Sequence, residues 1–213
     1  MNVQRINFGK FVIFINVFSG NAGANFTHHH DDLLSYVLYD SGREILIDPG
    51  MPNFLRPNEF SLNYRHNGIW CEEGLLRPMA RFFTPRSFFS DAIKLNILWD
   101  GLSFSASAQN IYTGDERVLH ITGDYSKIQV IETYRRTFGL SSFGFTHCFA
   151  DDVLNHHSPN KIKFAGLEFS YDRKVSVAMR CDRALAYGEP GVAHLISAKM
   201  VDGQFSWKMC RAV

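Results

Sequence analysis

Residues 28–50 read HHHDDLLSYVLYDSGREILIDPG, and this stretch decides how the chain can fold. Two apolar segments, Leu33–Tyr39 and Glu44–Ile47, flank the turn sequence Asp40-Ser41-Gly42. Apolar runs on either side of a short turn of this composition are typical of a β-hairpin. Antiparallel pairing about the turn returns Asp48 to the end of the hairpin that carries the histidines. We therefore expect a β-hairpin with metal-binding and acid–base groups at its open end.

The polar cluster before the hairpin has its own periodicity. His28, His30 and Asp32 alternate with His29 and Asp31. Successive side chains of an extended backbone point to opposite faces, so the first three would share one face. The alternation therefore predicts two imidazoles and a carboxylate on the same side of the chain.

The remainder of the chain alternates short apolar segments with turn residues such as Asp100-Gly101 and Gly123-Asp124. We find no long segment of helical periodicity and no internal repeat. Many short strands at regular spacing favour a sandwich of antiparallel sheets. We expect an all-β fold, a single antiparallel β-sandwich domain over residues 1–213 with little helix. Two further apolar runs, Pro78–Phe83 and Ala92–Trp99, flank a turn at residues 85–87. The expected strand segments are Lys10–Phe18, Leu33–Tyr39, Glu44–Ile47, Ile69–Cys71, Leu102–Ser107, Val118–Thr122, Lys127–Thr133, Phe143–Phe149, Ile162–Phe164, Leu167–Tyr171, Val175–Met179, Ala193–Ala198 and Phe205–Met209.

Composition excludes several classes of partner. The 213 residues carry a net charge of +1, so no bulk electrostatic attraction to nucleic acid or to an anionic membrane is indicated. No apolar stretch is long enough to span a membrane. We expect no nucleic-acid partner and no membrane span. A local basic cluster could still bind an acidic polysaccharide.

Cysteine usage gives no zinc-knuckle pattern. The four cysteines, at positions 71, 148, 181 and 210, are far apart and form no Cys-x-x-Cys pair. Buried free thiols are the favoured interpretation. Disulfides remain an alternative if the protein is exported.

The first residues fit two interpretations. Arg5 and Lys10 precede the apolar run Phe11–Phe18, and small residues follow at 20–24, in the order of a signal peptide. The run is short, is interrupted by Asn16 and is rich in β-branched and aromatic residues, which favours a strand. We predict a strand there.

His30, Asp48 and His66 together form a candidate Zn²⁺ site. Two imidazoles and one carboxylate, with a fourth position for water, are a usual donor set for this ion. Polar residues at exposed strand ends are the simpler explanation. The pair His28-x-His30 also suits the Fe²⁺ of a cupin-like oxygenase, but such sites usually have a Glu shortly afterwards, where this chain has Leu34. A non-catalytic carbohydrate-binding or scaffold domain is a third alternative.

The stretch resembles the signature of the heparinase II/III-like polysaccharide lyases, in their C-terminal β-sandwich domain. That family carries His-Gly-His-Ala-Asp, then Leu-Ser-Phe, a hairpin, and Val-Asp-Pro-Gly. The counterparts are residues 28–32, 34–36 and 47–50. A later family segment, Arg-Ser-Thr-x-x-His-Asn-Thr, is similar to residues 63–68 in the pair His66-Asn67 and departs elsewhere. Residues 145–150 are similar to a late family strand carrying Phe-His.

This resemblance implies roles for the clustered residues. His28 would reach into a catalytic cleft, and His30, Asp48 and His66 would hold a structural zinc. Asp32 would orient an imidazole, or would only cap the hairpin. Such lyases remove the C5 proton of a uronic acid and expel the C4 substituent, so the substrate would be an acidic polysaccharide. The family favours a periplasmic or secreted location, and a cytoplasmic one remains open.

In the family, the catalytic tyrosine, an asparagine or glutamate, and a further histidine belong to an N-terminal α/α toroid. We detect no helical repeat of that kind in this sequence. We expect the chain to correspond to the C-terminal domain, to be inactive alone, and to act with a toroid in cis or on a separate chain. If it were active alone, Tyr36 and Tyr64 would be the first candidates for the base.

Overall fold

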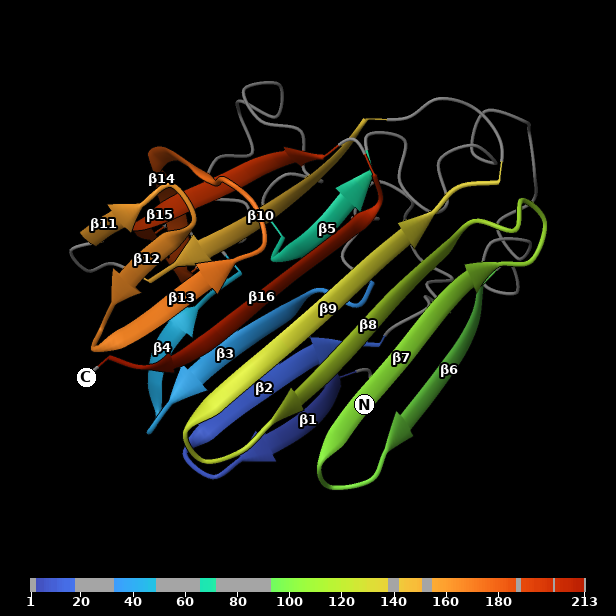
Figure 1. The fold of residues 1–213 in the computed structure, drawn as a ribbon, viewed down its shortest axis with the longest axis horizontal. Helices are drawn as coiled ribbons and strands as arrows, with labels where there is room; N and C mark the ends of the chain where they lie inside the picture. Colours follow the sequence, from blue (N-terminus) through green and yellow to red (C-terminus); the bar gives the residue numbers. More distant parts are fainter. Residues whose placement is uncertain are drawn as a thin grey trace.

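The computed structural model is a sandwich of two antiparallel β-sheets (Figure 1). It describes residues 3–17, 33–48, 66–71, 93–137, 142–150, 155–186, 189–200 and 202–212. Every regular element in these ranges is a β-strand. The expected all-β sandwich is therefore confirmed.

The first sheet has eight strands in the order β1-β2-β3-β4-β10-β15-β14, with β5 paired to β10. β5 and β4 share one edge of β10, because β5 pairs with Phe143–Thr146 and β4 with Phe149. The strands are β1 (Val3–Phe8), β2 (Phe11–Asn16), β3 (Tyr36–Asp40), β4 (Arg43–Leu46), β5 (Gly68–Cys71), β10 (Phe143–Phe149), β14 (Ser176–Ala186) and β15 (Glu189–Met200).

The second sheet also has eight strands, in the order β11-β12-β13-β16-β9-β8-β7-β6. Neighbouring strands of this sheet pair antiparallel, and they are joined either by hairpin turns or by longer connections, as in other sandwiches. The strands are β6 (Ile93–Trp99), β7 (Ser103–Asn110), β8 (Glu116–Gly123), β9 (Lys127–Arg135), β11 (Asn155–Ser158), β12 (Lys161–Phe164), β13 (Leu167–Tyr171) and β16 (Gln204–Arg211).

The predicted hairpin forms from β3 and β4. Asp40 pairs with Arg43 across a two-residue turn. Ser41 and Gly42 have φ angles of 54° and 83°, and positive values at both positions define a turn whose twist matches that of the strands. The strand begins at Tyr36 and not at Leu33, because Leu33 and Leu34 form a turn with Leu34 at a φ of 65°.

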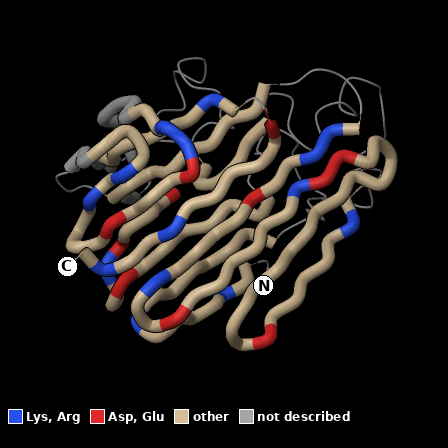
Figure 2. Tube along the Cα trace, viewed as in Figure 1, with Lys and Arg blue, Asp and Glu red and all other residues tan. Residues whose placement is uncertain are grey.

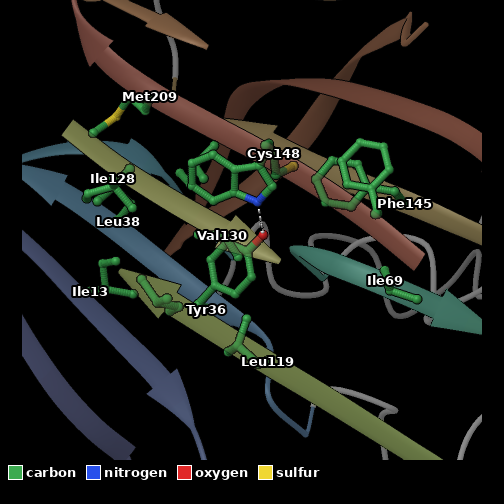
Figure 3. Packing of buried hydrophobic residues seen from close by; sticks show 14 of the residues in the cluster. Ile13, Tyr36, Leu38, Ile69, Leu119, Ile128, Val130, Phe145, Cys148 and Met209 are labelled. Carbon is green, nitrogen blue, oxygen red and sulfur yellow. Dashed lines mark hydrogen bonds between the residues drawn. The ribbon is translucent and has the colours of Figure 1, made fainter. Parts of the chain in front are cut away.

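The core lies between the sheets and follows the period-two alternation of the strands. Ile128 and Val130 of β9 are buried, and their neighbours along the strand face outward. Figure 3 shows them beside Ile13, Leu38 and Met209, from both sheets. Burial of these side chains is the main force that holds the two sheets together.

The N-terminal segment is an antiparallel hairpin at the edge of the first sheet. β2 lies within the predicted strand at residues 10–18, and β1 is an additional strand that we did not expect. β1 alternates exposed Val3, Arg5 and Asn7 with half-buried Gln4 and buried Ile6 and Phe8, as an edge strand does. Residues 3–16 therefore belong to the sandwich.

Cysteine burial is mixed. Cys71 and Cys148 are buried free thiols, as expected. Cys210 is free but exposed, because it alternates with the buried Met209 at the end of β16. The Cys181 side chain lies outside the described residues.

Charges of both signs are interspersed along the strands and turns (Figure 2). Neither sign dominates a region of the described chain, which agrees with the net charge of +1. Among the described residues, no helix is long and apolar enough to cross a membrane.

Candidate functional site

The structure brings together two of the three predicted zinc ligands. Asp48 follows β4 and His66 precedes β5, and the Asp48 Oδ2 and His66 Nδ1 atoms lie 2.9 Å apart. The His66 side chain is 11% exposed and that of Asp48 is 42% exposed. The pair therefore lies at the surface, with the imidazole largely covered and the carboxylate open to solvent.

This pair fits part of a zinc site. Two tetrahedral ligands at about 2.1 Å from the ion are about 3.4 Å apart, so the observed pair needs only a small displacement to bind a common ion. His28, His30 and Asp32 lie outside the described residues. Within the described part of the chain, no group of three or more His, Cys, Asp or Glu side chains is arranged to hold a metal ion.

Asn67 fixes the backbone around Asp48 and His66. Its side-chain Nδ2 donates to the carbonyls of Tyr36 at 2.7 Å and Ile47 at 2.9 Å. Its Oδ1 accepts from the Cys148 N–H at 2.7 Å. β10 pairs first with β5 and then with β4, and the Asn67 amide lies between these two pairings. It therefore provides hydrogen bonds to backbone groups that have no partner strand at this point.

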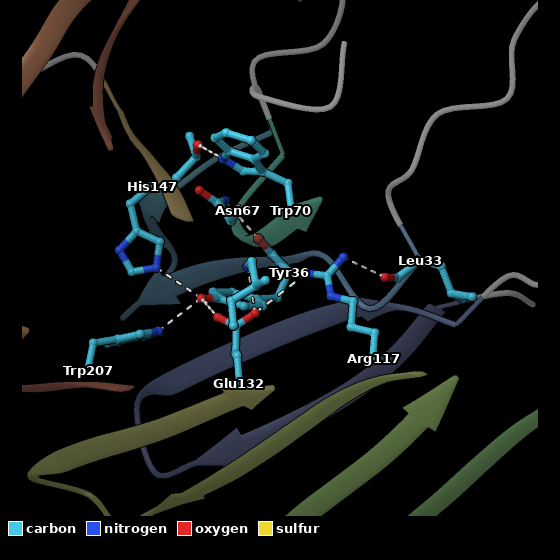
Figure 4. A network of polar contacts seen from close by, with 10 residues as sticks. Leu33, Tyr36, Asn67, Trp70, Arg117, Glu132, His147 and Trp207 are labelled. Carbon is cyan, nitrogen blue, oxygen red and sulfur yellow. Dashed lines mark hydrogen bonds and ion pairs between the residues drawn. The ribbon is translucent and has the colours of Figure 1, made fainter. Parts of the chain in front are cut away.

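A buried polar network adjoins this junction (Figure 4). Arg117 and Glu132, which are 3% and 0% exposed, form an ion pair with 3.5 Å between Nη2 and Oε2. Arg117 Nη1 donates to the Leu33 carbonyl at 2.8 Å. Glu132 Oε2 accepts from the Ile69 N–H at 2.9 Å. The second sheet thus binds main-chain groups of two segments that flank the candidate site.

The Tyr36 hydroxyl connects Glu132 to the aromatic core. It donates to Glu132 Oε1 at 2.8 Å and accepts from Trp207 Nε1 at 2.9 Å. Its one proton is committed to the carboxylate, so the contact of 2.9 Å with His147 Nε2 requires an N–H on that nitrogen. His147 Nδ1 then accepts from the Tyr171 hydroxyl at 3.1 Å.

Burial decides the charge states in this network. Desolvation holds the pKa of His147 well below its ordinary value, so the imidazole is neutral. Burial, together with the nearby Glu132 charge, raises the pKa of Tyr36 well above the ordinary value. Burial also raises that of Tyr171. The resulting order is Tyr171 to His147 to Tyr36 to Glu132, each group donating to the next.

Tyr36 and Tyr64 are the candidates for the catalytic base if the chain acts without a toroid. Tyr36 is only 3% exposed, and its hydroxyl faces the core, so no polysaccharide can reach it. Its raised pKa also opposes deprotonation. Tyr64 lies outside the described residues.

Sequence reasoning overlooked Arg117 and Glu132, although the sequence contains a signal for them. Glu132 continues the buried alternation of Ile128 and Val130, and Arg117 precedes Leu119 on the buried face of β8. A charge at each of two inward positions on adjacent strands predicts a buried ion pair, because an isolated buried charge is too costly.

No protein-family model and no curated protein matches this chain. The functional assignment therefore depends on the residues and geometry described above.

Proposed function

We propose that this chain is the β-sandwich of a zinc-containing, heparinase II/III-like polysaccharide lyase. The observation that supports this is the contact of 2.9 Å between Asp48 and His66, which are 18 residues apart in the chain. Both residues are predicted zinc ligands because their surroundings resemble the signature of this lyase family. Their proximity at the end of the β3–β4 hairpin is what a shared metal ion requires.

In this proposal, His30, Asp48 and His66 hold a structural zinc. A bound ion would neutralise the carboxylate and link the chain before β3 to the chain before β5. Asp32 would orient one of the imidazoles. The network around Asn67 keeps the Asp48 and His66 backbones at the correct separation.

The reaction would be β-elimination on an acidic polysaccharide that contains uronic acid. The C5 proton is weakly acidic, so the uronate must be neutralised while a base removes the proton. His28 would donate a hydrogen bond or positive charge to the uronate. The base and the remaining groups would come from an α/α toroid, in cis or on a separate chain.

Metal content tests the zinc set. Purified wild-type protein should contain one zinc per chain, and Asp48→Ala should lose most of it. Asp202→Ala is the matched control, since Asp202 is an exposed carboxylate that pairs with Arg173. Equal zinc in wild type and Asp48→Ala would remove Asp48 from the set. Redox-active iron would favour the cupin-like alternative.

Activity is measured by the absorbance of the 4,5-unsaturated product over a panel of acidic glycans. Residues 1–213 alone should form little product, because the groups of an elimination site act together. Activity should appear when a toroid is supplied, and His28→Ala should then reduce it. Rapid turnover by residues 1–213 alone would contradict the proposal. Glycan binding without turnover in either case would identify a non-catalytic carbohydrate-binding domain.

A further inference from the structure

β6 is an edge strand whose inner face is apolar and only partly covered. It ends the second sheet, and among the described strands it pairs only with β7 (Figure 1). Its inner-face residues, opposite the buried residues of β7, are Ile93, Leu95, Ile97 and Trp99. Ile93 is 7% exposed, whereas Ile97 and Trp99 are each 37% exposed, and Leu98 on the outer face is 73% exposed. Large apolar side chains therefore remain in contact with solvent toward the end of the strand.

The strands at the other ends of the two sheets have features that oppose pairing with a further strand. β11 has four residues and a shift of register between His156 and Ser158, and β14 has two such shifts. β1 presents the charged Arg5 at its exposed positions. Short length, bulges and charges are the usual protection of sheet edges. β6 has seven residues in unbroken register with β7, and its one charge, Lys94, lies at the covered end.

The backbone of β6 directs hydrogen-bonding groups toward the open edge at its inner-face residues. The Asp100 N–H donates to the Ser103 carbonyl at 3.3 Å, which closes the hairpin of β6 and β7. Residues at even positions of β6 therefore direct their N–H and C=O groups to β7, because these directions alternate along a strand. Leu95, Ile97 and Trp99 direct theirs away from β7. An added strand could bind all three residues.

We propose that β6 is a homodimer interface, in which it pairs antiparallel with β6 of a second copy about a two-fold axis at Ile97. Ile97 would exchange two backbone hydrogen bonds with Ile97 of the second copy, and Leu95 would do the same with Trp99 of the second copy. The second sheet would then run continuously through both copies, with both inner faces on one side. This inference does not depend on the proposed function.

The sequence of β6 is complementary to itself in this register. Lys94 would lie opposite Asp100 of the second copy, and the symmetry axis repeats this pair of opposite charges. Trp99, at the exposed end of one strand, would pack against Leu95 near the covered end of the other. Exposed ion pairs add little affinity, but they select the register. A second copy therefore covers the apolar surface that each sandwich leaves open.

The test is sedimentation velocity of residues 1–213 over a series of micromolar concentrations, in which the wild type should dimerise. Ile97→Lys places two ammonium groups at the axis and should raise the dissociation constant by about a hundredfold or more. Its matched control is Leu102→Lys, because Leu102 is also exposed but lies in the turn beyond the paired residues. Circular dichroism should show that both variants keep the wild-type fold.

Lys94→Glu tests the register and should weaken the dimer by about tenfold, since it sets two like charges opposite each other. Lys199→Glu, on exposed Lys199 of β15 in the first sheet, should leave the dimer unchanged. If Ile97→Lys does not fold, Lys94→Glu still decides the outcome, because its side chain lies on the outer face.

Amide hydrogen exchange distinguishes edge pairing from other modes of association. Exchange at the Ile97 amide should slow as the protein concentration rises, while exchange at Leu98, whose amide faces β7, should not change. A wild type that stays monomeric at every concentration would overturn the inference and leave the edge to a strand of another protein. A dimer that Ile97→Lys does not weaken, or in which the Ile97 amide gains no protection, would overturn it as well.

Discussion

The Tyr36 hydroxyl and the Glu132 carboxylate lie 2.8 Å apart, although their strands belong to opposite sheets. This bond sets the direction of the two hydrogen bonds that His147 makes with Tyr36 and Tyr171. Because Glu132 accepts the tyrosine proton, His147 must carry its proton on Nε2 and accept on Nδ1. The first predictions concern this arrangement.

Tyr36→Phe should destabilise the protein by about 3 kcal/mol, because it leaves several buried polar groups without a partner. Trp207 Nε1 and His147 Nε2 would lose their acceptor, and Glu132 would lose a donor. Urea unfolding followed by circular dichroism gives the free energy of unfolding. Tyr125→Phe is the control, because Tyr125 is 78% exposed, and should leave the stability unchanged.

Stability should fall in mild acid through His147. Its pKa is well below the ordinary value in the folded state, and it is about 6.5 in the unfolded chain. Below pH 6.5 the unfolded chain takes up a proton that the folded chain refuses, so acid favours unfolding. This residue should contribute a slope of about 1.4 kcal/mol per pH unit between pH 6 and the folded pKa.

The measurement for His147 is urea unfolding at a series of pH values from about 8 to about 5, a range that includes the ordinary histidine pKa. His147→Gln keeps hydrogen-bonding groups at the position and removes the titration. The wild-type slope should exceed that of the variant. Equal slopes would show that the folded protein protonates His147 as readily as the unfolded chain.

Stability should also fall in strong alkali, through Tyr36 and Tyr171. Burial raises the pKa of both hydroxyls, so above about pH 10 only the unfolded chain ionises them. The contribution of the two protonated hydroxyls to the free energy of unfolding is therefore fully present below about pH 10 and is lost as the pH rises. Absorbance of the phenolate should show these two tyrosines titrating only when the protein unfolds. Titration within the folded state would contradict their assigned protonation.

Asn67→Asp should destabilise the protein by about 3 kcal/mol or more, despite its nearly identical shape. A carboxylate cannot donate to the carbonyls of Tyr36 and Ile47, and it would place a negative charge against both oxygens. The control is Asn96→Asp on the exposed edge strand β6. Similar unfolding free energies for the two variants would show that the Asn67 bonds are dispensable.

Gly68→Ala should cost about 3 kcal/mol, from backbone strain together with overpacking. The new methyl group would meet Arg117 and Glu132. Gly42→Ala separates the two causes, since Gly42 has a φ of +83° but no atom within 4 Å of the added Cβ. Thermal or urea unfolding should give the Gly42 variant a loss of only about 1 kcal/mol. Equal losses would assign the whole effect to backbone conformation.

The hairpin of β3 and β4 could be predicted because its information is local. The turn residues Ser41 and Gly42 and the apolar runs beside them specify pairing within twelve residues or so, the usual span of a short hairpin. β1 was not predicted, because an edge strand needs apolar residues only on its inner face. The motif predicted that Asp48 and His66 lie close together. It did not predict the role of Asn67, because this residue binds the Ile47 carbonyl, which is distant in sequence.

The buried network could not be predicted in the same way. Tyr36, Glu132, His147, Tyr171 and Trp207 come from five strands in two sheets, so their contacts depend on the complete topology. The inward position of Glu132 was readable from the alternation of β9. Its partners were not, because hydrogen bonds across a core depend on how the sheets are placed against each other.

The bond between Tyr36 and Glu132 also governs the resistance of the sandwich to shear. Apolar side chains attract without regard to direction, and a core made only of them tolerates small translations of one sheet over the other. A hydrogen bond weakens steeply once its donor and acceptor move apart by more than roughly a few tenths of an ångström, or lose their alignment. Trp207 and Tyr36 add a second bond of the same kind across the same interface. A translation of one sheet over the other would break both hydrogen bonds at once, so the two sheets have one preferred relative position.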